Sequence, residues 1–230
     1  MGKQMNKSRI FESKIQPTLE FPMQWPELKT ADGYVVEPPA TSWERYPCGD
    51  EMSKQAKNNK HWTVLQRVLT AGAFAAGGFF VDMSLGQKPK DLDLYFDSAF
   101  TLKRTLGALL DLGYAITEEI IQDLEAGKSA VVITHPDNLI PINIVNMQYR
   151  NSITSFMEWF DLDVCMIGMS GTHLWQHRDW DFNFENRVMH YHVVTSWMRT
   201  QARVLKYEIK GFSLLDGAGR HSGTDITVVY

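Results

Sequence analysis

Two aspartates interrupt a short apolar segment near the middle of the chain. In DLDLYF, residues 91–96, Asp91 and Asp93 are separated by a single leucine. The segment is typical of a strand, and side chains two residues apart in a strand point to the same face. Two carboxylates at such a short distance repel each other unless a cation lies between them. Because Mg²⁺ and Mn²⁺ prefer oxygen ligands, the pair predicts a divalent metal site on one face of a sheet.

A pair of glycines precedes the aspartates at short range. Gly77 and Gly78 fall between a predicted strand at 73–77 and a predicted helix at 78–86. Glycine lets a phosphate approach the backbone closely, and N–H groups at a helix N-terminus attract anions. A phosphate-binding turn followed by a metal-binding carboxylate pair is typical of phosphoryl or nucleotidyl transfer. The alternative is that the two aspartates belong to a solvated surface.

The pattern along the chain predicts an α/β (α+β) fold, in which strands interleave with helices around a mixed sheet. Residues 1–58 contain six of the nine prolines and are interpreted as an N-terminal arm with a short strand at 33–37. The core is predicted at 59–170, and 171–230 form a C-terminal helical segment and tail. Helices are predicted at 61–72, 78–86, 101–114, 152–160 and 186–210, and strands at 73–77, 91–96, 129–135, 141–147 and 161–169.

Two of these helices carry clear apolar faces. The residues expected to be buried are Val64, Leu65, Val68 and Leu69 in the first, and Leu102, Leu106, Leu109 and Leu110 in the third.

Composition excludes several classes of protein. The formal net charge of −4 over 230 residues argues against a generally basic nucleic-acid coat. Cys48 and Cys165 lie far apart, so they indicate neither a disulfide scaffold nor a zinc knuckle. The N-terminus lacks the apolar run of a signal peptide, and the least polar stretch is too polar for a membrane span. We expect no membrane partner and a cytoplasmic location, in the host cell if the protein is viral.

The glycine pair and the aspartates together resemble the head-domain signature of the nucleotidyltransferase superfamily, especially its tRNA nucleotidyltransferase and poly(A) polymerase branch. The matching residues are Gly77, Gly78, Asp82, Leu85, Gly86, Lys90, Asp91 and Asp93. Val81 stands where that family usually has an arginine that contacts the triphosphate. A looser similarity to small, often viral, members extends to about residue 213. The resemblance implies a mixed sheet flanked by helices, in which two aspartates and a third carboxylate hold Mg²⁺ or Mn²⁺.

The third carboxylate has no obvious counterpart. The family usually places it on a neighbouring strand, which corresponds here to 141–147 and contains Asn143 but no acid. The next predicted strand contains Asp161 and Asp163, two positions apart and therefore on one face. The resemblance thus implies Asp161 as the third catalytic acid, with Asp163 as the next candidate for that role and as a further metal ligand. The alternative is that both acids stabilise a turn or cap.

The predicted C-terminal helix carries two stripes. The apolar stripe, expected to be buried, consists of Val188, Tyr191, Thr195, Met198, Ala202 and Leu205. The adjacent basic stripe consists of Arg199, Arg203, Lys206 and Lys210, and Glu208 is the only acid between 187 and 215. Such a stripe can bind triphosphate or an RNA backbone. The alternative is a solvated face whose cations favour the helix C-terminus.

Two histidines later in the chain are weaker candidates for metal ligands. His173 and His177 have the spacing of a metal pair on a helix, but no third ligand has suitable spacing. They are interpreted as part of a packed loop.

These features predict a metal-dependent nucleotidyltransferase that moves a nucleoside monophosphate from a nucleoside triphosphate to a hydroxyl. The first expected acceptor is an RNA (tRNA) 3′ end, because of the branch resembled, and a protein or small molecule is the toxin-like alternative. A catalytically inactive nucleotide- or RNA-binding module and a structural protein are the remaining alternatives. The site is predicted to consist of Asp91, Asp93 and Asp161 for catalysis, the same acids with Asp163 for the metal, and Gly77, Gly78, Lys90, Arg203 and Lys206 for the nucleotide.

Overall fold

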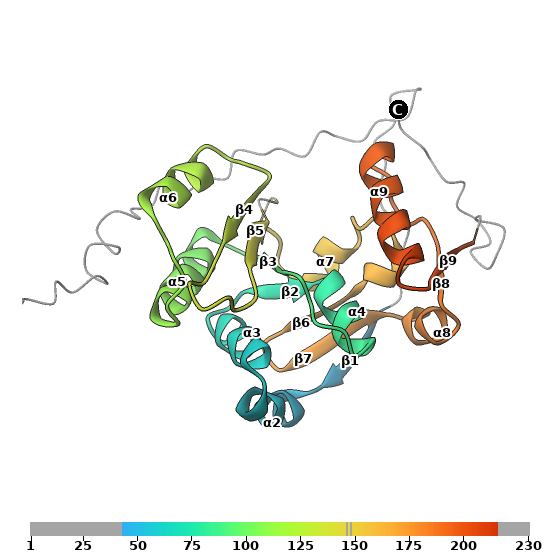
Figure 1. The fold of residues 1–230 in the computed structure, drawn as a ribbon, viewed down its shortest axis with the longest axis horizontal. Coiled ribbons are helices and arrows are strands. Elements are labelled where there is room, and N and C mark those ends of the chain that lie inside the picture. Colours follow the sequence, from blue (N-terminus) through green and yellow to red (C-terminus); the bar gives the residue numbers. More distant parts are fainter. Residues whose placement is uncertain (1–42, 146, 148, 216–230) are drawn as a thin grey trace, which may run out of the picture.

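The structure is a computed structural model that describes residues 43–145, 147 and 149–215 (Figure 1). The strand predicted at 33–37 and the tail from 216 onward lie outside these residues. Within the predicted arm, β1 (Trp43–Pro47) and α2 (Gly49–Asn58) are regular elements. The sequence pattern predicts neither element. β1 is defined by its pairing with a strand far along the chain, and local periodicity does not show such a pairing.

Seven strands form one mixed sheet, in the order β1-β7-β6-β2-β3-β5-β4. Among these pairs β3 and β5 run parallel, and the others run antiparallel. The sheet therefore extends beyond both predicted boundaries of the core, at 58 and at 170. The strands added to β1 are β2 (Phe74–Ala76), β3 (Leu92–Tyr95), β4 (Ala130–Ile133), β5 (Ile142–Val145), β6 (Ile167–Ser170) and β7 (His173–His177).

Helices cover both faces of this sheet. Figure 1 shows α5 and α6 near the β5–β4 edge, whereas α8 and α9 lie at the opposite side of the molecule beside the short pair β8 (Val188–Met189) and β9 (Ser213–Leu214). The helices after α2 are α3 (Lys60–Thr70), α4 (Gly78–Ser84), α5 (Ala99–Asp111), α6 (Glu118–Glu125), α7 (Ile153–Met157), α8 (Trp180–Glu185) and α9 (Trp197–Glu208).

Alternation along β3 separates the core from the functional face. Leu92 and Leu94 are fully buried in the main core, which also contains the apolar faces of α3 and α5. The other face of β3 presents Asp93 and Tyr95, and Tyr95 packs with α7 in a second apolar cluster. The predicted faces of α3 and α5 are confirmed, except that Leu110 is only partly buried.

The predicted strand at 161–169 is only partly correct. Residues 163–165 form a short 3₁₀ turn, and β6 begins at Ile167. Before the turn, the chain pairs with the extended residues 190–193, through bonds such as His192 N to Asp161 O at 2.8 Å. Asp161 and Asp163 consequently do not share a strand face, because the 3₁₀ turn changes the direction of the second side chain.

The long helix predicted at 186–210 is also corrected. It begins only at Trp197, since residues 188–193 form extended pairs that satisfy their backbone groups instead. The apolar stripe is wrong as well, because Met198 is 83% exposed and Leu205 is 58% exposed. The residues that α9 buries are Thr200, Val204 and Tyr207, which face the core on the opposite side of the helix. Among the described residues, no helix has the length and apolar character needed to cross a membrane.

The tight packing at Gly168 yields a test of this arrangement. A Cβ on Gly168, in β6, would lie 2.5 Å from the Ala75 backbone oxygen and 2.7 Å from Ile153 Cδ1. We expect Gly168→Ala to lower the free energy of unfolding by about 1–3 kcal/mol in urea denaturation, because the sheet or α7 must shift. Gly107→Ala in α5 is the matched control, since nothing lies within 4 Å of its Cβ. Alanine there should add roughly 0.5–1 kcal/mol. Equal stability of the two variants would contradict the packing described.

Candidate functional site

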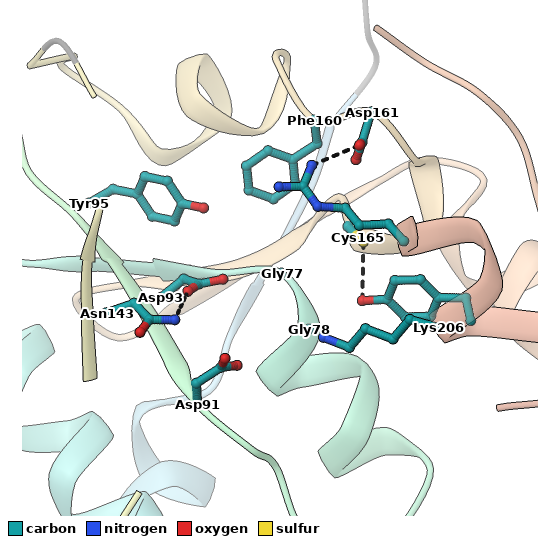
Figure 2. A pocket seen from close by; sticks show the side chains of 12 residues that line it. Gly77, Gly78, Asp91, Asp93, Tyr95, Asn143, Phe160, Asp161, Cys165 and Lys206 are labelled. Carbon is teal, nitrogen blue, oxygen red and sulfur yellow. Dashed lines mark hydrogen bonds and ion pairs between the residues drawn. The ribbon is translucent and has the colours of Figure 1, made fainter. Parts of the chain in front are cut away.

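A cavity of about 290 Å³ lies between the sheet and α9 (Figure 2). Its walls come from the turn between β2 and α4, from β3 and β5, from residues 160–165 and from α9. The cavity therefore joins the glycine–aspartate motif to segments that lie much later in the chain. The lining residues are Gly77, Gly78, Asp91, Asp93, Tyr95, Asn143, Phe160, Asp161, Cys165, Arg203, Lys206 and Tyr207.

The two aspartates enter the cavity together. Asp91 immediately precedes β3, Asp93 is the second residue of that strand, and both are partly buried. Figure 2 shows both side chains extending into the same space. Asn143 is the register partner of Asp93 on the parallel strand β5, and its Nδ2 donates a hydrogen bond to Asp93 Oδ1 at 2.7 Å. An amide thus occupies the position beside Asp93 where the resemblance implies an acid.

The electrostatic environment of Asp93 disfavours an isolated negative charge. Burial raises the pKa of Asp93 above its ordinary value, the Asn143 hydrogen bond lowers it, and the charge of Asp91 raises it. The charges of Lys206 and Arg203 act in the lowering direction. A cation bound between the two carboxylates would remove this penalty, because it favours the ionised form of each.

The glycine turn leaves open space beside the carboxylates. Gly77 has φ +92°, a conformation that favours glycine. A Cβ there would lie 3.9 Å from Asp93 Oδ2, and one on Gly78 would lie 3.6 Å from Lys206 Nζ. Val81, which stands where the resemblance implies an arginine, is fully buried, and the ammonium of Lys206 on α9 lies near Gly78.

Two ion pairs attach α9 and the turn that follows it to the core. Arg203 NH1 lies 2.7 Å from Asp161 Oδ2, and Thr200 Oγ1 donates to the same oxygen at 2.9 Å. Lys210 pairs with Asp82 of α4, and both side chains are at least nine-tenths buried. The basic stripe is therefore partly neutralised by acids from other elements.

Most residues predicted for the site do line the cavity. Those that do are Asp91, Asp93, Asp161, Gly77, Gly78, Arg203 and Lys206, and those that do not are the exposed Lys90 and the buried Asp163.

The carboxylate of Asp163 serves a structural network outside the cavity. Its Oδ2 accepts hydrogen bonds from Asn183 Nδ2 and His190 Nδ1, each at 2.7 Å, and its Oδ1 accepts one from the His190 backbone at 2.8 Å. Asp163 is thereby engaged in joining the 3₁₀ turn to α8 and to the extended segment at 190.

Some residues that line the cavity were not predicted as site residues. Tyr95 follows Asp93 by two positions, so the alternation of β3 could have identified it. Phe160, Cys165 and Tyr207 carry no local signal, because only the tertiary fold brings them to β3. Cys165 Sγ donates to the Tyr207 hydroxyl at 3.2 Å, and burial raises the pKa of the Cys165 thiol to about 12. This thiol therefore remains protonated and is a poor nucleophile at neutral pH.

The donor set fits a divalent ion that binds together with a nucleotide. No three His, Cys, Asp or Glu side chains form a metal-binding group within the described part of the chain. Asp91 and Asp93 supply two hard oxygen donors, and Mg²⁺ is commonly held by one or two carboxylates plus substrate phosphates. His173 and His177 lie in β7, between β1 and β6, rather than on a helix or in a packed loop.

Solved structures of CCA-adding enzymes share this fold. The Thermotoga maritima enzyme in complex with tRNA aligns with a TM-score of 0.53 at 12% identity, over 76% of this chain and 44% of that one. An apo form of a CCA-adding enzyme gives a TM-score of 0.54 over the same shares, and a complex with CTP gives 0.51 over 74% and 42%. The chain thus has a nucleotidyltransferase-like fold and spans less than half the length of these enzymes. No curated protein matches the sequence.

A match to a family model identifies the family of this chain. The model of the Gabija anti-defense 2 family matches residues 49–193, which include the glycine turn, the aspartate pair and Asp161. Because the matched segment covers more than half of the sequence, the chain belongs to the Gabija anti-defense 2 family.

Proposed function

We propose that this chain is a metal-dependent nucleotidyltransferase, which moves a nucleoside monophosphate from a nucleoside triphosphate to a hydroxyl acceptor. The observation that carries the proposal is one cavity with two carboxylates, Asp91 and Asp93, on the sheet and Lys206 on α9. The turn between them has no side chains, since Gly77 lies beside Asp93 and Gly78 lies beside Lys206. An acidic metal site beside a cation and an open backbone turn is the arrangement that binding a triphosphate requires.

Asp91 and Asp93 would hold Mg²⁺ or Mn²⁺. When bound, such an ion neutralises negative charge on the phosphates and favours ionisation of the attacking hydroxyl. Lys206 would contact the β- or γ-phosphate, in place of the arginine that Val81 replaces. The acceptor oxygen forms a bond to the α-phosphorus, the bond from that phosphorus to the bridging oxygen breaks, pyrophosphate leaves, and the hydroxyl proton passes to solvent.

Asp161 remains our proposed third carboxylate. Arg203 and Thr200 both contact its Oδ2, and in the described structure no donor bonds to Oδ1. The side chain lines the cavity, so Oδ1 is available to orient an acceptor hydroxyl or a water.

An RNA 3′ end is the first acceptor we propose, because a matched CCA-adding enzyme was solved with tRNA. The family name favours a second candidate, a hydroxyl on a protein component of the Gabija defence. The neutralisation of Arg203 and Lys210 by core acids supports this second candidate, since it leaves fewer cations for an RNA backbone. In either case the proposed role of the transfer is to counteract that defence.

The test of the proposed function is incorporation of label from α-³²P nucleoside triphosphates, each incubated with total RNA or with Gabija proteins. We expect Mg²⁺-dependent labelling by wild type. Asp93→Asn should reduce it by more than the roughly 10- to 100-fold expected for an outer-shell residue. Labelling by the variant at the wild-type rate would rule out this site. Nucleotide-induced thermal stabilisation without any labelling would instead favour a binding module, in line with the amide at Asn143.

Asp93→Asn also has a predicted effect on stability. Because the pKa of Asp93 is raised in the folded state, ionisation of this carboxylate destabilises the fold progressively as the pH rises from the ordinary pKa to the raised value, and fully above it. In EDTA, the variant should therefore have a higher Tm than wild type at pH 7. The two should converge below about pH 4, where the aspartate is protonated in both states. A lower Tm for the variant at pH 7 would contradict the electrostatic account.

Asp161 and Asp163 offer a matched comparison. Asp161→Asn should slow transfer, measured per folded molecule in single turnover, because it removes the carboxylate that faces the cavity. Asp163→Asn should leave that rate unchanged and lower the free energy of unfolding by roughly 1–3 kcal/mol, because it disrupts buried bonds to His190 and Asn183. Equal rates in both variants would exclude Asp161 as the third acid.

Lys206 and Arg199 compare two cations on the same helix. Lys206 lines the cavity, whereas Arg199 is exposed outside it. Lys206→Ala should weaken binding of a nucleoside triphosphate by roughly 10- to 100-fold in calorimetry, as loss of a charged hydrogen bond does. Arg199→Ala should leave it unchanged. If Lys206 binds RNA instead, its loss should flatten the slope of log affinity against log salt by about 0.7.

A further inference from the structure

Tyr95 is a part of the cavity that the proposed reaction does not use. It follows Asp93 on the same face of β3, and its side chain is only 5% exposed. The ring packs against Phe156 and Phe160, with centroid distances of 5.2 and 5.9 Å. The position of the hydroxyl is therefore fixed by the apolar cluster behind the ring.

Among the described residues, that hydroxyl forms no hydrogen bond, although Tyr95 lines the cavity. Figure 2 shows the hydroxyl pointing into the open space. Two other buried tyrosines differ, since Tyr114 donates to the Ile140 carbonyl at 2.8 Å and Tyr207 accepts from Cys165. A buried tyrosine hydroxyl usually has a partner, so this one is placed to bind a ligand.

The sheet register locates this hydroxyl relative to the parts of a nucleotide. β2 runs antiparallel to β3 and pairs Phe74 with Tyr95, so the glycine turn that follows β2 lies toward the Asp91 end of β3. Tyr95 lies at the other end, about 6–7 Å beyond Asp93 along the strand. If the β- and γ-phosphates lie at Gly78 and Lys206, and the α-phosphate lies at the aspartates, the sugar is the next group in the direction of Tyr95.

We propose that Tyr95 is a specificity residue whose hydroxyl hydrogen-bonds a ribose hydroxyl of the bound nucleotide, so that the site prefers ribonucleotides to deoxyribonucleotides. The inference rests on the proposed nucleotide site and adds the sugar as the feature that the site reads. A site built to pair with a substrate hydroxyl rejects an analogue that lacks it, because the buried protein group then remains unpaired.

The test is equilibrium binding to the full chain by calorimetry, in Ca²⁺ to suppress turnover. The probes are the tightest-binding of ATP, CTP, GTP and UTP, together with its 2′-deoxy and 3′-deoxy forms. Wild type should bind the ribonucleotide about 3- to 10-fold more tightly than at least one deoxy form. Tyr95→Phe should weaken ribonucleotide binding by the same factor and abolish the preference, because the ring remains and only the hydroxyl is lost.

Tyr46→Phe is the matched control, since that hydroxyl bonds Glu44 on the exposed strand β1. Tyr46→Phe should leave the affinities for the ribonucleotide and for its two deoxy forms unchanged. Equal affinity of wild type for all three sugars would overturn the inference, as would a preference that persists in Tyr95→Phe. Unchanged affinities with slower transfer in Tyr95→Phe would also overturn it, and would place the hydroxyl beside the acceptor. Failure of wild type to bind any triphosphate would instead contradict the proposed function itself, and this inference with it.

Discussion

The two-residue alternation of β3 is the constraint on which the rest of this site depends. Leu92 and Leu94 are fully buried, so the opposite face must carry the side chains between them. A slip of one residue would place two carboxylates in an apolar core, which is far too unfavourable to persist. The burial of two leucines therefore sets the direction of Asp91, Asp93 and Tyr95. One strand thus provides the proposed metal ligands and the proposed sugar contact.

The second wall of the cavity depends on charge rather than on alternation. α9 presents an exposed apolar side to solvent, and it is attached to the core by Arg203–Asp161 on the helix and by Lys210–Asp82 directly after it. Removing one partner of a buried ion pair leaves an uncompensated charge, which destabilises a protein by about 3–5 kcal/mol. The pair Lys210–Asp82 is the more buried of the two, and it joins the turn after α9 to α4, next to the glycine turn. The ion pairs thus hold Lys206 over that turn.

The fold and the family membership support different parts of the functional argument. A likeness to CCA-adding enzymes at 12% identity establishes the architecture, and one architecture hosts many activities. The proposed chemistry therefore rests on the cavity itself, where acids, cations and an unpaired hydroxyl meet. Asn143 is the informative departure, because an amide cannot supply the negative charge that an acid would supply beside Asp93. This departure is why the amount of transfer, and not only nucleotide binding, has to be measured.

The sequence by itself determined the elements whose signals are local. The glycine turn, α4 and β3 are recognisable within twenty residues, and α3 and α5 show their buried faces through helical spacing. Strand alternation predicted that both aspartates share one face, and the resemblance drawn from those residues predicted the nucleotidyltransferase-like fold.

Only the tertiary structure decided the features that depend on distant partners. The sequence of residues 190–193 predicts a helix, but these residues pair with 160–163 instead. The backbone groups of that segment satisfy their hydrogen bonds. The outward apolar side of α9 has the spacing of a buried stripe, and periodicity cannot tell which side of a helix meets the core. Arg203 and Lys210 look unpaired locally, since Asp161 and Asp82 lie on other elements. Asp161 and Asp163 are both candidate site residues by their sequence positions, yet a 3₁₀ turn places only Asp161 at the cavity. Local spacing encodes direction within an element, whereas the partners of a charge or an apolar face are set by how the elements pack.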